Sequence, residues 1–121
     1  MKELTTLDIY VLSEKLSDYI WHLFDAWDRK AQNTLGYQII RAADSISANI
    51  AEGYGCYHYA DRKRFYFYAR GSFEEVKTWL GKARRRNLLS DEDTIFLQNI
   101  THELGPKLNA FIRSTNKGAK N

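Results

Sequence analysis

Apolar and small residues recur through much of this chain in alternating steps of four and three, which is the spacing of one face of a helix. The repeat is clearest in two segments, at about residues 29–53 and 60–87. A half-buried strand has a period of two, so this spacing predicts two long amphipathic helices. The positions are Leu35, Ile39, Ala42, Ile46, Asn49 and Gly53 in the first segment, and Phe65, Ala69, Ser72, Val76, Trp79 and Ala83 in the second.

Two flanking segments show a similar pattern and predict helices at about residues 7–27 and 91–113. Ser90 and the acidic turn that follows it are typical of a helix start. Because most connections are short, the four helices predict an all-α, antiparallel up-down four-helix bundle, with residues 1–121 as a single domain. The repeats are Leu12, Leu16, Tyr19, Leu23 and Trp27 in one segment, and Phe96, Ile100, Leu104, Leu108, Phe111 and Thr115 in the other.

Glycine and proline positions refine these predictions. Gly36 inside a helix costs about 1 kcal/mol relative to Ala, which indicates either close packing or a later helix start. Gly53-Tyr54-Gly55 predicts a helix end with a left-handed glycine. Gly105-Pro106 predicts an interruption and a kink in the last helix. Residues 114–121 are polar and basic, so we expect them to fray.

Several kinds of protein do not fit the sequence. Cys56 is the one cysteine and makes no internal disulfide, and no apolar run approaches the roughly 18 residues of a membrane span. The start of the chain lacks the apolar core of a signal peptide, so we expect a cytoplasmic protein without a membrane partner. The three histidines show no ligand spacing, and no nucleophile–base pattern or Gly-rich loop occurs. We therefore predict no catalytic, cofactor-binding or metal-binding residues.

The stretch from residue 38 to residue 75 carries a resemblance to a known family. It contains Ser45-Ile46-Ser47-Ala48-Asn49-Ile50-Ala51-Glu52-Gly53 and, later, Ala69-Arg70-Gly71-Ser72. This combination resembles the four helix bundle protein family, also called the S23 ribosomal or 23S rRNA intervening-sequence protein family. The motif residues, for which we expect structural or interface roles, are Gln38, Arg41, Ser45, Asn49, Glu52, Gly53, Gly71, Ser72 and Glu75.

The resemblance implies a four-helix bundle assembled as a ring-like homopentamer, with a poorly defined role. It also implies an architecture similar to that of a nucleic-acid-binding accessory protein of diversity-generating retroelements. Nucleic-acid binding is in this case an analogy between folds. The chain departs from the family pattern at Cys56, where an Arg is usual, and at Pro106, where the last helix is usually uninterrupted.

Positive charge is concentrated in one segment. Residues 61–86 hold nine Lys/Arg and three Asp/Glu, whereas the rest of the chain is net negative. Four of these cations are seven residues apart, so they drift only about 20° per step around the helix. Tyr66 and Phe73 fall near that row, where aromatic rings can stack on bases while cations neutralise phosphates. The predicted RNA-binding or DNA-binding residues are Lys63, Arg70, Lys77, Arg84, Arg85 and Arg86; the alternative is that they are solvated charges beside core aromatics.

The polar motif residues of the second helix also have two interpretations. An acid, a base and a hydroxyl could indicate catalysis, but a polar network at a helix or subunit interface is the interpretation that we favour. A hairpin turning near Tyr57 brings Arg41 toward the region of Glu75 and Glu52 toward Arg62. We therefore predict an Arg41–Glu75 ion pair. Two functional hypotheses follow: a non-catalytic homo-oligomer that binds RNA or DNA, or an oligomeric protein-interaction scaffold.

Overall fold

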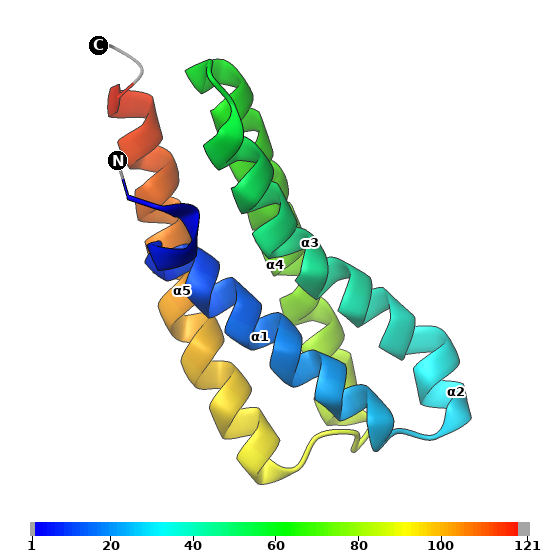
Figure 1. Ribbon diagram of the computed structural model, residues 1–121. Helices are drawn as coiled ribbons and strands as arrows, with labels where there is room; N and C mark the ends of the chain where they lie inside the picture. The colour runs from blue at the N-terminus through cyan, green and yellow to red at the C-terminus, as the bar shows by residue number, and fades with distance from the viewer. Residues whose placement is uncertain (1, 119–121) are drawn as a thin grey trace.

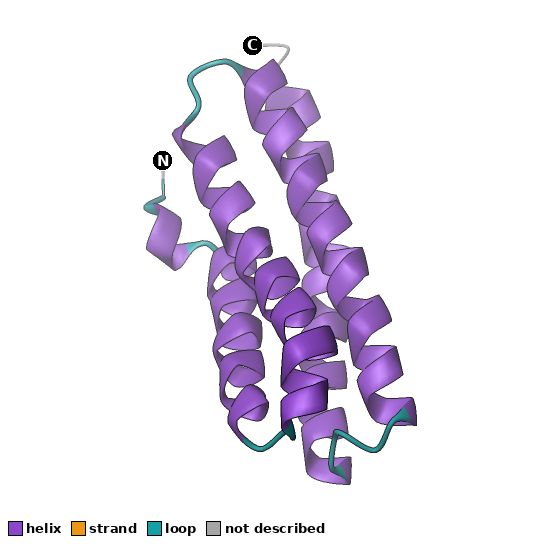
Figure 2. Ribbon diagram, turned by 90° about the vertical axis from the view of Figure 1, so that its right-hand side faces the viewer, coloured by secondary structure: helices purple, strands orange, loops and turns teal. Residues whose placement is uncertain are grey.

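Four long helices that run alternately up and down form this protein in a computed structural model, which describes the backbone of residues 2–118 and the side chains of residues 2–115 (Figure 1). Within that range every element is helical and no strand occurs (Figure 2). The all-α four-helix prediction is confirmed, and the predicted boundaries of the first three helices are within about two residues of those observed. The elements are η1 (Leu4–Thr6), α1 (Asp8–Asp25), α2 (Arg29–Ala31), η2 (Gln32–Gly36), α3 (Tyr37–Gly55), α4 (Tyr59–Arg85) and α5 (Asp91–Gly118).

The second predicted helix consists of three consecutive elements, α2, the π-helical turn η2, and α3. A Cβ atom on Gly36 would lie 2.8 Å from two carbons of the Phe24 ring, so only glycine fits there without displacing that ring. Gly36 is also the last residue of η2, and regular α-helix begins at Tyr37. Both explanations of this glycine therefore hold, because it packs closely and the regular helix starts late.

α3 and α4 approach each other closely at Gly53. A Cβ atom there would lie 2.7 Å from Cε1 of Tyr66 and 3.0 Å from the carbonyl oxygen of Arg62. Tyr66 is 2% exposed, and burial raises the pKa of its hydroxyl to about 12. Further along the hairpin, the hydroxyl of Ser72 donates a hydrogen bond of 3.0 Å to the hydroxyl of Ser45. These two contacts define how α3 and α4 align.

The apolar surface of α4 that falls outside its repeat packs against α5. The rings of Tyr66 and Phe111 meet edge to face with centroids 5.0 Å apart. Phe73 is 3% exposed and reaches to within 3.1 Å of where a Cβ on Gly105 would stand. A helix of the same chain therefore buries Tyr66 and Phe73.

The ends of α3 and α4 differ from the prediction. α3 ends after Gly55 as expected, but none of the described glycines has a positive φ. The chain leaves the helix through Cys56, which is extended. The left-handed residue is instead Asn87, with φ of 60°. Leu88 N–H bonds to the Ala83 carbonyl at 2.9 Å, and Asn87 N–H bonds to that of Arg84 at 3.1 Å. This pair of bonds is a Schellman motif, in which asparagine replaces the more common glycine.

α5 continues through Pro106, so the predicted interruption is wrong (Figure 1). Pro106 lacks the N–H that would bond to the carbonyl of His102, but both residues are exposed and water can reach that carbonyl. The helix also extends beyond residue 113 to Gly118, so fraying from residue 114 is not observed, and residues 119–121 lie outside the described range.

α5 begins with a capping box, and the carboxylate of that box also bonds to α1. The Ser90 hydroxyl accepts a 3.0 Å bond from Asp93 N–H, and Asp93 Oδ2 accepts a 3.1 Å bond from Ser90 N–H. Asp93 Oδ1 also accepts a 2.6 Å bond from the hydroxyl of Tyr19 on α1. The Tyr19 ring stacks on Phe96 with centroids 4.1 Å apart. The predicted cap at Ser90 is confirmed, and the capping carboxylate links two helices.

Replacement of Gly53 by alanine should destabilise the bundle by about 1–3 kcal/mol, because the added methyl group overlaps the buried Tyr66 ring. Gly81→Ala is the matched control in α4. Its Cβ would lie 3.4 Å from one side-chain nitrogen of Arg85, and it should gain up to about 1 kcal/mol of helix propensity. Urea denaturation measures both variants. Equal effects of the two substitutions would refute a specific role for Gly53.

The Tyr19–Asp93 pair should make stability depend on pH at both extremes. Burial alone would raise the pKa of Asp93, but bonds from Tyr19 and Ser90 outweigh it and lower that pKa. Asp93 therefore stabilises the fold above its unfolded pKa of about 3.9, and this contribution is lost as pH falls through its lower folded value. The bond to Asp93 raises the pKa of Tyr19 to about 12, so the Tyr19 contribution is complete below pH ~10 and is lost as pH rises through about 12.

Asp93→Asn should consequently lose less stability than the wild type between about pH 5 and pH 2, measured by urea denaturation over a pH series. Tyr19→Phe removes the hydroxyl but keeps the ring, and should raise the pKa of Asp93 toward its ordinary value. Parallel acid-denaturation profiles for all three proteins would contradict this assignment.

Candidate nucleic-acid interface

Most of the predicted basic residues lie along the exposed side of α4 that borders α5. Arg70 and Lys77 line a depression of about 520 Å³ between the two helices, and Lys77 and Arg84 line an adjoining one of about 210 Å³. Lys63 continues the row one heptad earlier and is partly exposed, while Arg85 and Arg86 are exposed at the end of α4. All six side chains are at least partly exposed, but Arg86 lines a different depression, together with Lys30 and Thr34. We call Lys63, Arg70, Lys77, Arg84 and Arg85 the basic row.

Few carboxylates form ion pairs with the cations of the basic row. Among the described side chains, only Lys77 has an ion-pair partner within the row, at 2.9 Å from Glu74 one helical turn away. An exposed pair of this kind contributes about 0–1 kcal/mol, so a phosphate can displace it at little cost. Arg70 instead lies over the Phe67 ring, 4.8 Å from its centroid.

The aromatic residues assigned to base stacking are not available for it. Tyr66 and Phe73 are 2% and 3% exposed, because they fill the interface with α5. That part of the prediction is wrong. Phe67 and Tyr68 are the exposed aromatic residues in this part of α4, at 36% and 52%. Helical spacing alone could have indicated Phe67 as the aromatic residue beside the cations, because it lies one turn from both Lys63 and Arg70.

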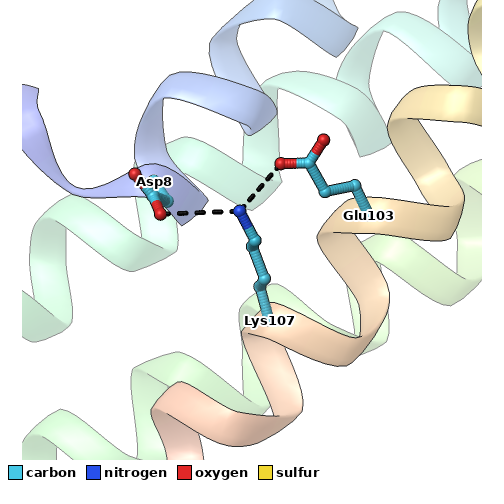
Figure 3. Close-up of polar contacts among 3 residues, drawn as sticks. All are labelled: Asp8, Glu103 and Lys107. Atoms are coloured by element: carbon cyan, nitrogen blue, oxygen red, sulfur yellow. Dashed lines mark hydrogen bonds and ion pairs between the residues drawn. The ribbon is translucent and has the colours of Figure 1, made fainter.

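In contrast, the charge of Lys107 on α5 is neutralised by two carboxylates. Its Nζ lies 2.8 Å from an oxygen of Glu103 and 3.5 Å from an oxygen of Asp8 on α1 (Figure 3). The bond to Glu103 chiefly raises the pKa of this fully exposed amine, with the charge of Asp8 adding to the effect. Among the described side chains, the largest group of cations without a carboxylate partner lies on α4.

The family-motif residues lie on α3 and α4, mostly with exposed or half-exposed side chains. Gly53 is the buried member. The predicted Arg41–Glu75 ion pair is wrong: Arg41 donates to Gln38 at 2.9 Å, and Glu75 accepts from the Trp79 indole at 3.0 Å. The Ser45–Ser72 bond explains this, because it sets the alignment of the two antiparallel helices. One turn away from that bond, Arg41 lies opposite Val76. Glu75 is one residue earlier, so its side chain points to another side of α4.

At the end of α3, side chains donate hydrogen bonds to backbone carbonyl groups. Arg62 does lie beside α3, but its Nε donates to the carbonyl oxygen of Cys56 at 2.5 Å, and no ion pair with Glu52 occurs among the described side chains. The Cys56 thiol donates to the carbonyl oxygen of Glu52 at 3.3 Å. Both bonds close the turn between α3 and α4.

Gly71, one of the motif residues expected to have a structural or interface role, makes no close contact within the chain. An added Cβ would have no other atom within 4 Å, so this mid-helix glycine faces open space. Asn49 bonds to the carbonyl and hydroxyl of Ser45 within its own helix, at 2.8 and 3.0 Å. Apart from the buried Gly53, the motif residues therefore form a polar surface of large and small side chains on α3 and α4.

Negative charge collects on the opposite pair of helices. Burial raises the pKa of Asp44 on α3, and the nearby charges of Glu14 and Asp18 on α1 raise it further. The described side chains include no cation paired with any of these three. The molecule thus has an acidic side at α1 and α3 and a basic side along α4.

Among the described residues, no group of three or more His, Cys, Asp or Glu side chains is arranged to hold a metal ion. None of the described helices combines the length and apolar character needed to cross a bilayer.

Comparison with known proteins gives a family and a fold. Residues 5–110 match the model of a family described as 23S rRNA-intervening sequence protein. A crystal structure of a protein of unknown function from the S23 ribosomal protein family of Bacteroides thetaiotaomicron VPI-5482 has a TM-score of 0.75 and 23% sequence identity, covering 87% of this chain and 95% of that one. No curated protein matches the chain. At this identity, the structural likeness establishes the fold alone.

Proposed function

This chain belongs to the 23S rRNA-intervening sequence protein family, and we propose that it is a non-catalytic, cytoplasmic, homo-oligomeric bundle protein that binds RNA or DNA through the basic row on α4. The observation that carries the proposal is the position of Arg70, Lys77 and Arg84 along surface depressions, with a single carboxylate partner between them. Adjacent members are about 10 Å apart along the helix axis, since they are separated by seven residues. Such a row complements the repeated charges of a phosphate backbone.

The motif surface on α3 and α4 supports self-association. A glycine inside a helix costs about 1 kcal/mol relative to Ala, and at Gly71 nothing within the chain compensates for that cost. Close contact with a second copy would account for a residue without a side chain at this position. The stoichiometry that we propose is the ring-like homopentamer implied by the sequence resemblance, and a closed ring would repeat the basic row and raise the avidity for a polyanion.

A second candidate function is an oligomeric protein-interaction scaffold without nucleic-acid binding. The acidic side near Asp44 favours this alternative, because it could receive the basic row of a neighbouring copy. Nucleic-acid binding is nevertheless our first choice, since the basic row borders depressions between helices whereas Asp44, Glu14 and Asp18 line none of those described.

Reversing the charges at Lys77 and Arg84 to Glu should abolish binding of labelled RNA and DNA. In the wild type, fluorescence anisotropy should show affinity that falls linearly with log salt, by about 0.7–0.9 counterions per phosphate contact. Lys15→Glu with Lys30→Glu is the matched control, because it changes net charge equally at exposed sites outside the basic row. Absence of binding at low salt, or equal losses in both double variants, would refute this interface and leave the scaffold as the better candidate.

Gly71→Arg should convert the oligomer into a folded monomer. The open space at Gly71 accommodates a long side chain, so helix content by circular dichroism should remain, while light scattering should report the mass of one chain. Asn99→Arg adds the same charge at an exposed site on α5 and should leave the oligomer intact. A wild-type protein that is monomeric at micromolar concentration would rule out the self-association proposal.

A further inference from the structure

The two depressions between α4 and α5 adjoin and run along both helices. Both are lined by Lys77 from α4 and Thr101 from α5, so these two residues mark the place where they meet. The first reaches Arg84 at one end of the bundle, and the second reaches Arg113 on the last described turns of α5. We call this combined feature the α4–α5 groove.

The charge of the α4–α5 groove comes from both helices. α4 supplies Arg70, Lys77 and Arg84, whereas α5 supplies Arg113, which is exposed and which the sequence analysis did not single out. Glu74 is the acid in the lining, and Lys77 already neutralises it at 2.9 Å. The groove therefore attracts anions along its length, and the cations from Arg70 to Arg84 span about 21 Å of helix.

An exposed aromatic ring lies against the groove-lining Arg70, one helical turn before it in α4, and is not itself part of the groove lining. Phe67 is 36% exposed, and its ring centroid lies 4.8 Å from the Arg70 guanidinium carbon and 5.6 Å from Lys63 Nζ. A ring flanked by two cations can stack on a base while both cations bind the adjacent phosphates. Apolar side chains, including Leu80 and Pro106, line the groove further along.

We infer that the α4–α5 groove binds single-stranded nucleic acid, with Phe67 stacking on a base and Arg113 contacting the backbone from the α5 side. This inference rests on the proposed nucleic-acid binding and adds which form is bound. In a duplex the bases are stacked on one another and present their edges in the grooves, so an exposed ring and an apolar lining contribute little. A single strand exposes base faces and phosphates together, which matches an elongated groove with both kinds of lining.

The test compares a labelled single-stranded RNA with a duplex of the same length and sequence, by fluorescence anisotropy across a salt series. Phe67→Leu keeps an apolar side chain but removes the ring, and should weaken single-strand binding by about fivefold or more without changing the salt slope. Tyr68→Leu is the matched control, since Tyr68 is exposed on another side of α4. It should bind like the wild type.

Arg113→Gln supplies an independent readout on the other helix. It should reduce the salt slope by about 0.7, the contribution of one phosphate contact to a single strand. Light scattering on each variant should give the wild-type mass. A change in mass on replacing Phe67 would assign that ring to a subunit contact and overturn the inference.

The outcomes separate this inference from the proposed function. Equal affinity for single strand and duplex, with Phe67→Leu and Arg113→Gln unchanged but the Lys77/Arg84 reversal still inactive, would overturn the groove and leave the basic row as a backbone-binding surface. Absence of binding to either nucleic acid would overturn both. Preference for the single strand, lost on replacing Phe67 and retained on replacing Tyr68, would establish the groove as its site.

Discussion

The close contact between α3 and α4 determines how the other helices can be placed. At Gly53 the helix backbone meets the Tyr66 ring with no room for a methyl group, and further along the hairpin Ser45 and Ser72 share a hydrogen bond. Gly53, Ser45 and Ser72 are small, so the two backbones can approach at these contacts. Tyr66 and Phe73 face α5, which packs against them through Phe111 and the space left by Gly105.

The same packing explains why the basic row is exposed. Once Tyr66 and Phe73 occupy the interface with α5, the positions beside them on the helix surface can only lie at the rim of that interface. Arg70 and Lys77 occupy those positions, with Lys77 Nζ 5.0 Å from the Phe73 ring centroid and Arg70 over Phe67. Long basic side chains suit such a rim, because their methylene stems cover apolar surface while the charges reach water. The basic surface is thus a consequence of how α4 divides its apolar residues between two neighbours.

Helical periodicity and local capping signals were enough to predict the number, type and approximate limits of the helices. The cap at Ser90 was predictable because its bonds are local, whereas the bond from Tyr19 to Asp93 spans 74 residues and depends on the packed bundle. The Arg41–Glu75 pair failed for a related reason: hairpin topology brings two regions together, but a shift of one residue turns a side chain through about 100°. Pro106 was misjudged because the local cost of proline was weighed without knowing that the affected carbonyl lies at an exposed site.

In the candidate site, too, the features that could be predicted are local, and those that could not depend on tertiary packing. A spacing of seven residues is sufficient to place four cations in one row, and each of those positions was predictable from the sequence. Which aromatic residues accompany them depended on which face of α4 meets α5, so Tyr66 and Phe73 were chosen where Phe67 is the exposed ring. Arg113 was not foreseen because it lies on another helix, more than forty positions along the chain from Arg70. A ligand-binding groove formed between two helices has half of its lining outside any single periodic segment, so its second wall emerges only from tertiary packing.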